Sequence, residues 1–249
     1  MSSFKKVIIL IMALGWLQPN IKAQTVNYGL TGGLTAGSPI GAVPDGATGK
    51  PGKGTMLGFF IKYKLSERFR IQSELFYSYK SASFHTPISG DTTYQQVILG
   101  TTYNIPTSYN GWVRGSFGNQ YLDLPVLLTI KLFRKLDFLI GPQLSYLFKG
   151  KNTGKADLKI GTDPNNPYTT VTNEPFDESA QINRWDYGIA GGFNYEASQR
   201  LNFALKLTSG LRSIYKDSYT LTDGTVRNVY MQCSLDYRIG HISTVDLAN

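Results

Sequence analysis

The feature that most constrains this chain is a strict alternation of apolar and polar residues, which recurs in segments of about ten to thirteen residues. In the segment 55–65, for example, Leu57, Phe59 and Ile61 share one face, whereas Lys62 and Lys64 lie on the other. A period of two is that of a β-strand with one apolar face. The pattern predicts eight strands, at residues 27–36, 55–65, 69–80, 121–132, 136–148, 183–196, 201–212 and 229–239.

The connections between these strands alternate in length. The tight ones are 66–68, 133–135 and 198–200, and the long ones, rich in Gly, Pro, Asn, Thr or Asp, are 37–54, 81–118, 150–181 and 213–225. In an antiparallel meander, alternate turns lie at opposite ends, so all long loops would share one end. Within the second long loop, residues 94–103 alternate again, which is interpreted as a strand extension beyond the membrane or an extracellular hairpin. Short periplasmic turns and long extracellular loops are typical of transmembrane β-barrels.

The first residues have the order of a secretory signal peptide. Lys5 and Lys6 precede an apolar run at 7–17, and a small residue, Ala23, follows a short polar stretch. The run is shorter than the roughly 20 residues that a membrane-spanning helix needs, which makes a retained anchor the weaker alternative. We therefore expect a signal peptide at 1–23 and a single β-barrel domain at 24–249.

Alternation alone does not separate a membrane barrel from a secreted, soluble β-sandwich, because both need one apolar face per strand. The leader and the strand lengths favour the membrane barrel. Seven tyrosines near strand ends would form the two interfacial belts: Tyr63, Tyr77, Tyr79, Tyr146, Tyr187, Tyr195 and Tyr237. The charged rows would then face the lumen and pair with one another: Lys62, Arg70, Glu74, Asp123, Lys131, Glu196, Lys206, Asp236 and Arg238.

Composition excludes several other classes of protein. The formal net charge is +8, and three of the lysines lie in the leader, so the surplus is too modest to favour a nucleic-acid partner. Cys233 is the only cysteine, which excludes an internal disulfide framework and a multi-cysteine metal cluster.

Candidate catalytic residues are few. The chain has two histidines, His85 and His241, which the strand order places at opposite ends of the barrel, so no triad can include both. A single-histidine site of His85 with Asp91 is the remaining enzyme hypothesis, and it would fit a lipid A-modifying enzyme or a protease. The adjacent acids Asp177 and Glu178 are interpreted as solvated or calcium-attracting. We expect no catalytic activity, no metal site and no cofactor.

The segment DPNNPY at 163–168 lacks the regular oxygen spacing of a calcium loop and is interpreted as a turn. Glycine-rich stretches at 29–33 and 188–192 lack the strand–loop–helix context of a phosphate site. They are better explained as small residues of the inner barrel wall that make room for bulky residues opposite.

Three segments together resemble a known family: YLDLPVLL at 121–128, LIGPQLSYL at 139–147 and RWDYGIAGGFNYE at 184–196. They resemble the PorT-like outer-membrane β-barrel proteins of Gram-negative bacteria, and the resemblance spans nearly the whole mature chain. It implies an eight-stranded barrel in the outer membrane. Most members have no assigned activity, and the namesake is associated with a secretion system. One departure is that Tyr237 is followed by residues 238–249, whereas such barrels usually end at an aromatic residue of the last strand.

The sequence therefore predicts an all-β, eight-stranded, antiparallel, up-and-down transmembrane barrel in the Gram-negative outer membrane. Its expected function is of the structural or interaction type, with the long outer loops contacting partners or ligands. The expected partners are outer-membrane lipid or lipopolysaccharide, the outer-membrane assembly machinery and secretion-system proteins, and no nucleic acid. The alternative is a narrow, porin-like pore or an accessory component of protein secretion.

Overall fold

A computed structural model of the chain describes residues 25–41, 44–98, 101–161, 169–217 and 224–243. The expected signal peptide at 1–23 and the DPNNPY turn lie outside these residues. The strands are β1 Thr25–Gly41, β2 Thr48–Lys64, β3 Phe69–Ile98, β4 Thr101–Lys131, β5 Leu136–Lys149, β6 Asn152–Gly161, β7 Thr169–Asp177, β8 Trp185–Glu196, β9 Leu201–Gly210 and β10 Val226–Ser243, with one 3-10 turn, η1, at Ser179–Gln181. No helix in the described part of the chain is long and apolar enough to cross a membrane.

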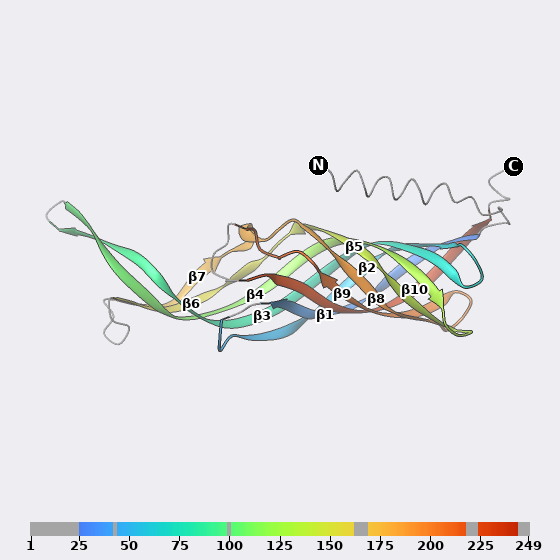
Figure 1. The fold of residues 1–249 in the computed structure, drawn as a ribbon, viewed down its shortest axis with the longest axis horizontal. Helices are drawn as coiled ribbons and strands as arrows, with labels where there is room; N and C mark the ends of the chain where they lie inside the picture. The colour runs from blue at the N-terminus through green and yellow to red at the C-terminus, as the bar shows by residue number, and fades with distance from the viewer. Residues whose placement is uncertain (1–24, 42–43, 99–100, 162–168, 218–223, 244–249) are drawn as a thin grey trace.

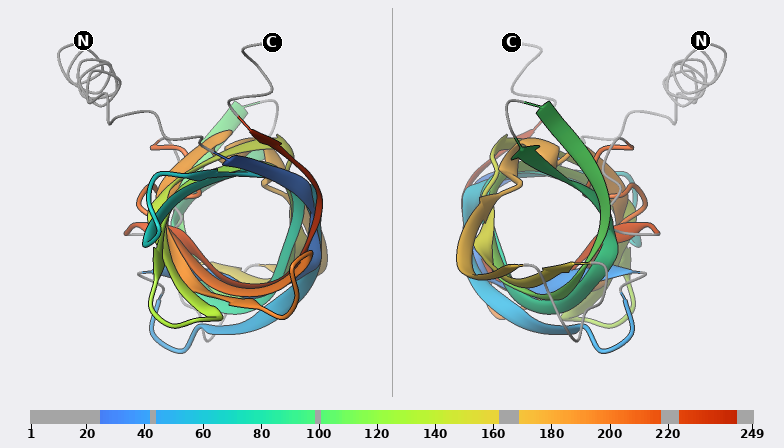
Figure 2. Two further views of the ribbon diagram at one scale, coloured as in Figure 1. Left: turned by 90° about the vertical axis from the view of Figure 1, so that its right-hand side faces the viewer. Right: turned by 90° about the vertical axis from the view of Figure 1, so that its left-hand side faces the viewer.

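Eight of the strands close into a ring (Figure 2). Neighbours around the ring are β1, β2, β3, β4, β5, β8, β9 and β10, all antiparallel, and β10 pairs with β1 to complete it. Closure gives every strand two neighbours, so the backbone groups within the barrel have hydrogen-bond partners in an environment without water. The predicted eight-stranded, up-and-down barrel is confirmed.

The orientation of the strand faces is that of a membrane barrel. Leu205 is 49% exposed on the outside, whereas its neighbour Lys206 is 1% exposed inside. The same opposition recurs along the other strands, and large apolar side chains on the outer surface such as Leu57 and Phe59 are more than 60% exposed. In water each such side chain would cost about 1 kcal/mol or more, whereas contact with acyl chains removes that cost. The apolar rows therefore face lipid, as predicted.

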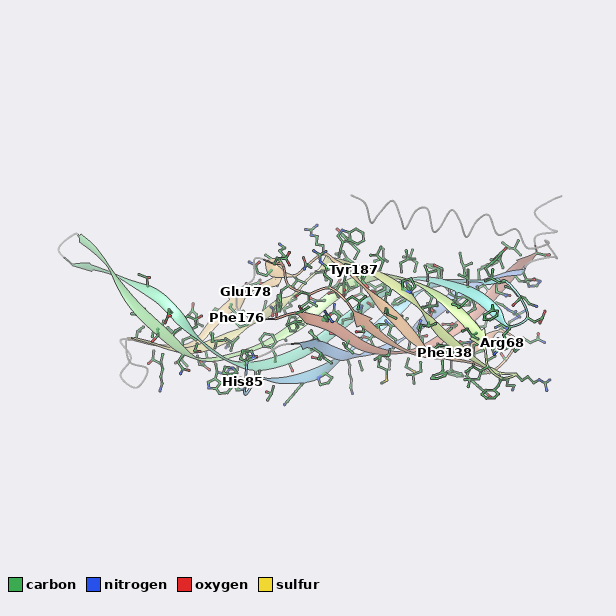
Figure 3. The ribbon with its side chains drawn as sticks, viewed as in Figure 1. Arg68, His85, Phe138, Phe176, Glu178 and Tyr187 are labelled. Atoms are coloured by element: carbon green, nitrogen blue, oxygen red, sulfur yellow. The ribbon has the colours of Figure 1, made fainter. Side chains whose placement is uncertain are left out.

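Aromatic side chains mark both ends of this apolar band. Near the tight turns, the rings of Phe138 and Phe193 lie 5.6 Å apart, and towards the other end those of Tyr146 and Trp185 lie 4.8 Å apart. Figure 3 shows Phe138 at the end with the tight turns and Tyr187 farther along the barrel. From the start of β5 to Tyr146 is ten residues, which spans about 25 Å for a tilted strand, the height of an outer-membrane apolar band.

Two of the three tight turns are fixed by serine side chains. Ser66 Oγ accepts a hydrogen bond from the backbone N–H of Phe69 at 3.1 Å, and Ser198 Oγ does the same for Leu201 at 3.1 Å. A serine at the start of a turn can satisfy the backbone in this way without a longer loop. All three tight connections, 65–68, 132–135 and 197–200, are one residue longer than predicted.

The long loops are a correction to the sequence-based prediction, because most of their residues are strand. The expected loop at 81–118 is a continuous hairpin in which β3 and β4 pair as far as Ile98 and Thr101, so the strand extension interpreted for 94–103 reaches back to the barrel. The expected loop at 150–181 contains β6, which pairs with β4, and β7, which pairs with β6. Strand also occupies 37–41 and 48–54 of the first loop. Outside the membrane the outer face need not be apolar, so the alternation fades while the backbone pairing continues.

The result is an elongated molecule (Figure 1). The four strand segments beyond the ring, namely 86–98 of β3, 101–117 of β4, β6 and β7, form what we call the outer blade. Its tip lies at the left of Figure 1, and the tight turns lie at the opposite end. The first and last described residues, Thr25 and Ser243, pair with each other at the end with the tight turns.

Candidate functional site

The lumen nearest the tight turns contains ion pairs between strands that are not neighbours in the ring. Arg70 Nη1 lies 2.7 Å from Glu196 Oε1 and 3.2 Å from Asp137 Oδ2. On β2, the strand next to that of Arg70, Lys62 Nζ lies 3.4 Å from Asp236 Oδ2 of β10. The second carboxylate oxygen of Asp236 accepts a hydrogen bond from Thr31 Oγ1 at 2.8 Å. Successive side chains of a strand point to opposite faces, and each of these groups lies on the polar face, which is turned inward.

At mid-height the lumen holds a fully buried ion pair. Lys206 Nζ donates to the Glu74 carboxylate, and the two side chains are 1% and 0% exposed. Gln72 Nε2 donates to the other Glu74 oxygen at 2.6 Å, and the Lys206 ammonium lies 5.5 Å from the centre of the Phe76 ring. Burial of two charges is tolerated only where hydrogen bonds satisfy them, and this cluster provides such bonds.

A second buried pair lies nearer the outer end. Lys80 Nζ lies 3.1 Å from the Asp123 carboxylate, with the two side chains 3% and 0% exposed. Gln143 Nε2 and Ser78 Oγ also donate to Asp123. The Lys80 ammonium lies over the ring of Tyr121, 4.5 Å from its centre.

The remaining interior is packed with side chains. Leu127, Leu139 and Ala190 form a fully buried cluster inside the ring. The Phe60 ring packs so closely on Gly29 that a Cβ built at Gly29 would lie 2.8 Å from Phe60 Cζ. Beside Lys80 a cavity of only about 10 Å³ is left, which is room for about one water molecule. Side chains therefore fill the described lumen at this depth.

The structure brings seven of the nine sequence-predicted lumen charges into ion pairs: Lys62, Arg70, Glu74, Asp123, Glu196, Lys206 and Asp236. Arg238 instead donates to Asn27 Oδ1 at 3.2 Å. Lys131 is half-buried near a tight turn, and no described carboxylate lies within 4 Å of its ammonium.

Three further lumen charges were missing from the predicted set: Lys80, Asp137 and Asp186. The oxygen Oδ2 of Asp186 accepts a hydrogen bond from Asn228 Nδ2 at 2.9 Å. All three occupy the polar parity of their strands, so the signal that would have identified them was present in the alternation.

The candidate catalytic residues do not converge. His85 is exposed and stacks on Trp112, with ring centres 4.6 Å apart. Asp91 lies six residues farther along the same extended strand, about 20 Å away, so the two side chains cannot touch. His241 pairs with Asn27 at the opposite end of the barrel. The geometry does not assemble the hypothetical site of His85 with Asp91.

The adjacent acids at the end of β7 have separate roles. Asp177 accepts a hydrogen bond from the backbone N–H of Ser179 at 2.9 Å, and hydrogen bonding to Ser179 holds the pKa of Asp177 below its usual value. Glu178 lines a cavity at the outer end of the lumen. Within the described residues, no group of three or more His, Cys, Asp or Glu residues could hold a metal ion.

Comparison with known proteins gives a family for the chain. The sequence profile of the family described as "Outer membrane protein beta-barrel domain" matches residues 22–216. No curated protein sequence matches the chain.

Similar solved structures include an attachment invasion locus protein, a surface protein and a protease. Ail of Yersinia pestis, solved with the heparin analogue sucrose octasulfate, has a TM-score of 0.37 and 9% identity over 88% of this chain and 100% of Ail. Neisserial surface protein A has a TM-score of 0.40 and 9% identity over 86% of this chain and 99% of that protein. The outer membrane protease OmpT of Escherichia coli has a TM-score of 0.25 and 9% identity over 90% of this chain and 99% of OmpT.

Proposed function

The chain belongs to the family of outer membrane protein beta-barrel domains, and from that membership we propose that it is a non-catalytic anchor in the Gram-negative outer membrane whose outer blade contacts a partner. The single observation that carries the proposal is the length of the hairpin of β3 and β4. Beyond His85, the last partner of β2, this hairpin continues for thirteen residue pairs, from Thr86–Val113 to Ile98–Thr101. That is about 40 Å of paired strand outside the ring, which barrel closure does not require.

One edge of the outer blade supports contact by strand addition. In the described structure, β3 beyond His85 pairs with β4 alone, so its other edge is open. The opposite edge, β7, is interrupted by Pro175, which has no backbone N–H, and by Asn173 with a φ of 57°. An extended segment of a partner protein can add to the open β3 edge through main-chain hydrogen bonds.

The filled lumen supports an anchor rather than a channel. The Lys206–Glu74 pair, the leucine cluster and the packed Phe60 ring occupy the interior at mid-height. In planar bilayers, the purified barrel should therefore give closed traces. Steady ion conductance would favour the narrow pore instead.

In-cell photo-crosslinking tests the contact. A photoreactive amino acid replaces Ser89, an exposed blade residue, and in a matched control it replaces Arg68 in a tight turn. Discrete adducts are expected from position 89 only, and they should disappear when residues 91–108 are replaced by Asn-Gly. A shift in gel mobility on boiling shows that each variant is folded. Asp91 and Asn110, also exposed on the blade, are two further positions for the photoreactive residue. Folded, surface-exposed variants that give no adduct from any of these three blade positions would contradict the proposal.

A second candidate is an accessory role in protein secretion. The PorT-like segments at 121–128, 139–147 and 184–196 support it, because the namesake of that group is associated with a secretion system. Comparison of secreted proteins between a deletion strain and its complemented parent tests it. An unchanged set of secreted proteins would remove this candidate.

The domain boundaries and remaining partners are part of the same proposal. We propose that residues 1–23 are removed on export and that 24–249 form the single mature domain. The mass of the protein purified from outer membranes checks the cleavage point. Lipopolysaccharide and the outer-membrane assembly machinery are the proposed partners of the barrel wall.

A further inference from the structure

A cavity of about 490 Å³ opens at the outer end of the lumen. Its wall is formed by residues of β1, β2, β3, β4, β6, β7 and β10, together with the connection before β2. Figure 3 shows Phe176 and Glu178, two of its lining residues, together at this end of the molecule. We call this space the outer cavity, and its volume is typical of a small-molecule site.

The lining changes from polar to apolar where the outer cavity begins. On β3 the inward residues just below this level are Ser78 and Lys80, and beyond it they are Ala82 and Phe84. Ile88, farther along the same face, also lines the cavity. The inward row of β3 is therefore polar just below the outer cavity and apolar along it.

Other strands make the same change at the same level. On β4, Asn119 is followed outward by Phe117 and Val113, and on β10, Asn228 is followed outward by Val226. The rings of Phe84 and Phe117 have centres 5.2 Å apart, and those of Phe84 and Phe176 have centres 6.5 Å apart. The wall is thus a joined aromatic and aliphatic surface.

The outer cavity has a closed floor. Ile214 and Tyr215, from the connection between β9 and β10, fold into the ring and pack with Phe117 and Val226. Two hydrogen bonds from Asn183 fix this segment. The Asn183 Nδ2 donates to the Tyr215 carbonyl oxygen at 2.7 Å, and the Asn183 backbone N–H donates to the Ile214 carbonyl oxygen at 2.7 Å. A molecule entering from outside would therefore be held and not passed on.

An apolar, concave wall at the watery end of a barrel is costly unless something covers it. Each large apolar side chain that is half-exposed there costs about 1 kcal/mol, and a ligand that covers several of them recovers that free energy. The mouth of a water-filled barrel would be lined with polar residues, as are the inward positions just below the cavity on β3, β4 and β10. The lining therefore indicates an apolar ligand.

The charge of the lining restricts the ligand further. Among the described lining residues there is no lysine or arginine, and Glu178 is the one ionisable acid. A carboxylate or phosphate inside the cavity would lack a cationic partner and would meet a like charge. We propose that the outer cavity binds a small apolar molecule that carries no negative charge.

Binding of two matched ligands to the full barrel in lipid nanodiscs tests this inference. The ligands are 2-naphthalenemethanol and 2-naphthoate, which share the ring system and differ in charge. Binding is measured by calorimetry and saturation-transfer NMR, with empty nanodiscs as the blank. The alcohol should bind saturably to one site, and the carboxylate should bind at least tenfold more weakly.

Two neighbouring residues supply the matched variants. Ile88 lines the cavity, whereas Ser89 is exposed on the other face of the same strand. Ile88→Glu should weaken binding of the alcohol at least tenfold and Ser89→Glu by less than twofold, while Thr86→Trp, which fills the space, should abolish binding. The shift in gel mobility on boiling shows that each variant is folded.

Three outcomes would overturn the inference: no saturable binding of the alcohol up to about 1 mM, equal or tighter binding of the carboxylate, or equal losses for the two glutamate variants. The crosslinking experiment on the outer blade does not depend on this cavity, so the two proposals fail separately.

Discussion

Replacement of Lys206 by methionine tests whether the lumen is dry at mid-height. Methionine keeps most of the length of the lysine side chain but leaves the Glu74 carboxylate, which is 0% exposed, without its cation. Only the Gln72 amide, 2.6 Å away, then remains as a described partner. Removal of one member of a buried ion pair costs about 3–5 kcal/mol, so the free energy of unfolding should fall by that amount.

A double-mutant cycle separates loss of the pair from loss of packing. In Lys206→Met with Glu74→Met, both charges are gone, and replacement of a buried pair by apolar residues is neutral or stabilising by about 1–4 kcal/mol. The double variant should therefore be more stable than Lys206→Met alone by at least about 3 kcal/mol. Lys159→Met, at an exposed position on β6, is the matched control and should be near neutral.

Urea unfolding in phospholipid vesicles measures these differences. Trp185 reports on unfolding, because it faces outward with 49% exposure and leaves the lipid when the barrel opens. A loss below about 1 kcal/mol in Lys206→Met, as for a solvent-exposed pair, would show that water fills the lumen and would refute the reasoning.

Three further predictions concern the lipid-facing wall, the pairing of β1 with β10, and the end of β7. Leu205→Arg should destabilise the barrel in vesicles by about 2–4 kcal/mol in urea unfolding, and no loss would mean that this face does not meet lipid. Gly29→Ala should abolish the heat-modifiable form, because its Cβ would lie 2.1 Å from a β10 carbonyl oxygen, whereas Gly32→Ala, with nothing closer than 3.4 Å, should keep it; equal behaviour would contradict this. Hydrogen bonds from Ser179 lower the pKa of Asp177, so the stability it adds at the end of β7 is present above the ordinary value of 3.8 and lost as pH falls below it. The protection factor of the Ser179 amide, which is its exchange rate corrected for the intrinsic rate at the same pH, should therefore fall in acid, and Asp177→Asn should remove this pH dependence of the protection factor. A pH dependence that persists would exclude Asp177 as its source.

The fold could be predicted because the lipid imposes a simple rule on the barrel wall. Neighbours such as Leu205 and Lys206 must face opposite solvents, and that requirement is visible in the sequence. Outside the membrane the rule no longer applies. The residues 81–98 continue in hydrogen-bonded strand, yet Ser83 and Ser89 occupy the outer face, so the sequence there is typical of a loop.

Strand parity predicts which charged residues face the lumen, but it does not predict which of them form ion pairs with one another. Strand parity places Glu74 and Lys206 inside, and it would have added Lys80 had it been applied throughout. The contact of Lys206 with Glu74 joins residues 132 positions apart on strands that are not neighbours in the ring. That contact depends on the stagger of the whole barrel, which no local pattern carries. The apolar outer cavity needed the structure for the same reason.

The pairing of β1 with β10 also constrains how the molecule can be made. These strands lie at opposite ends of the described sequence, yet they are matched along the full length of β1, from Thr25 with Ser243 to Gly41 with Val226. The barrel can close only after β10 has been synthesised, and until then β1 and β9 each have an unpaired edge. A chain that ended before β10 would therefore be an open sheet whose two unpaired edges could pair with strands of other chains. The closed barrel thus requires the complete set of eight ring strands.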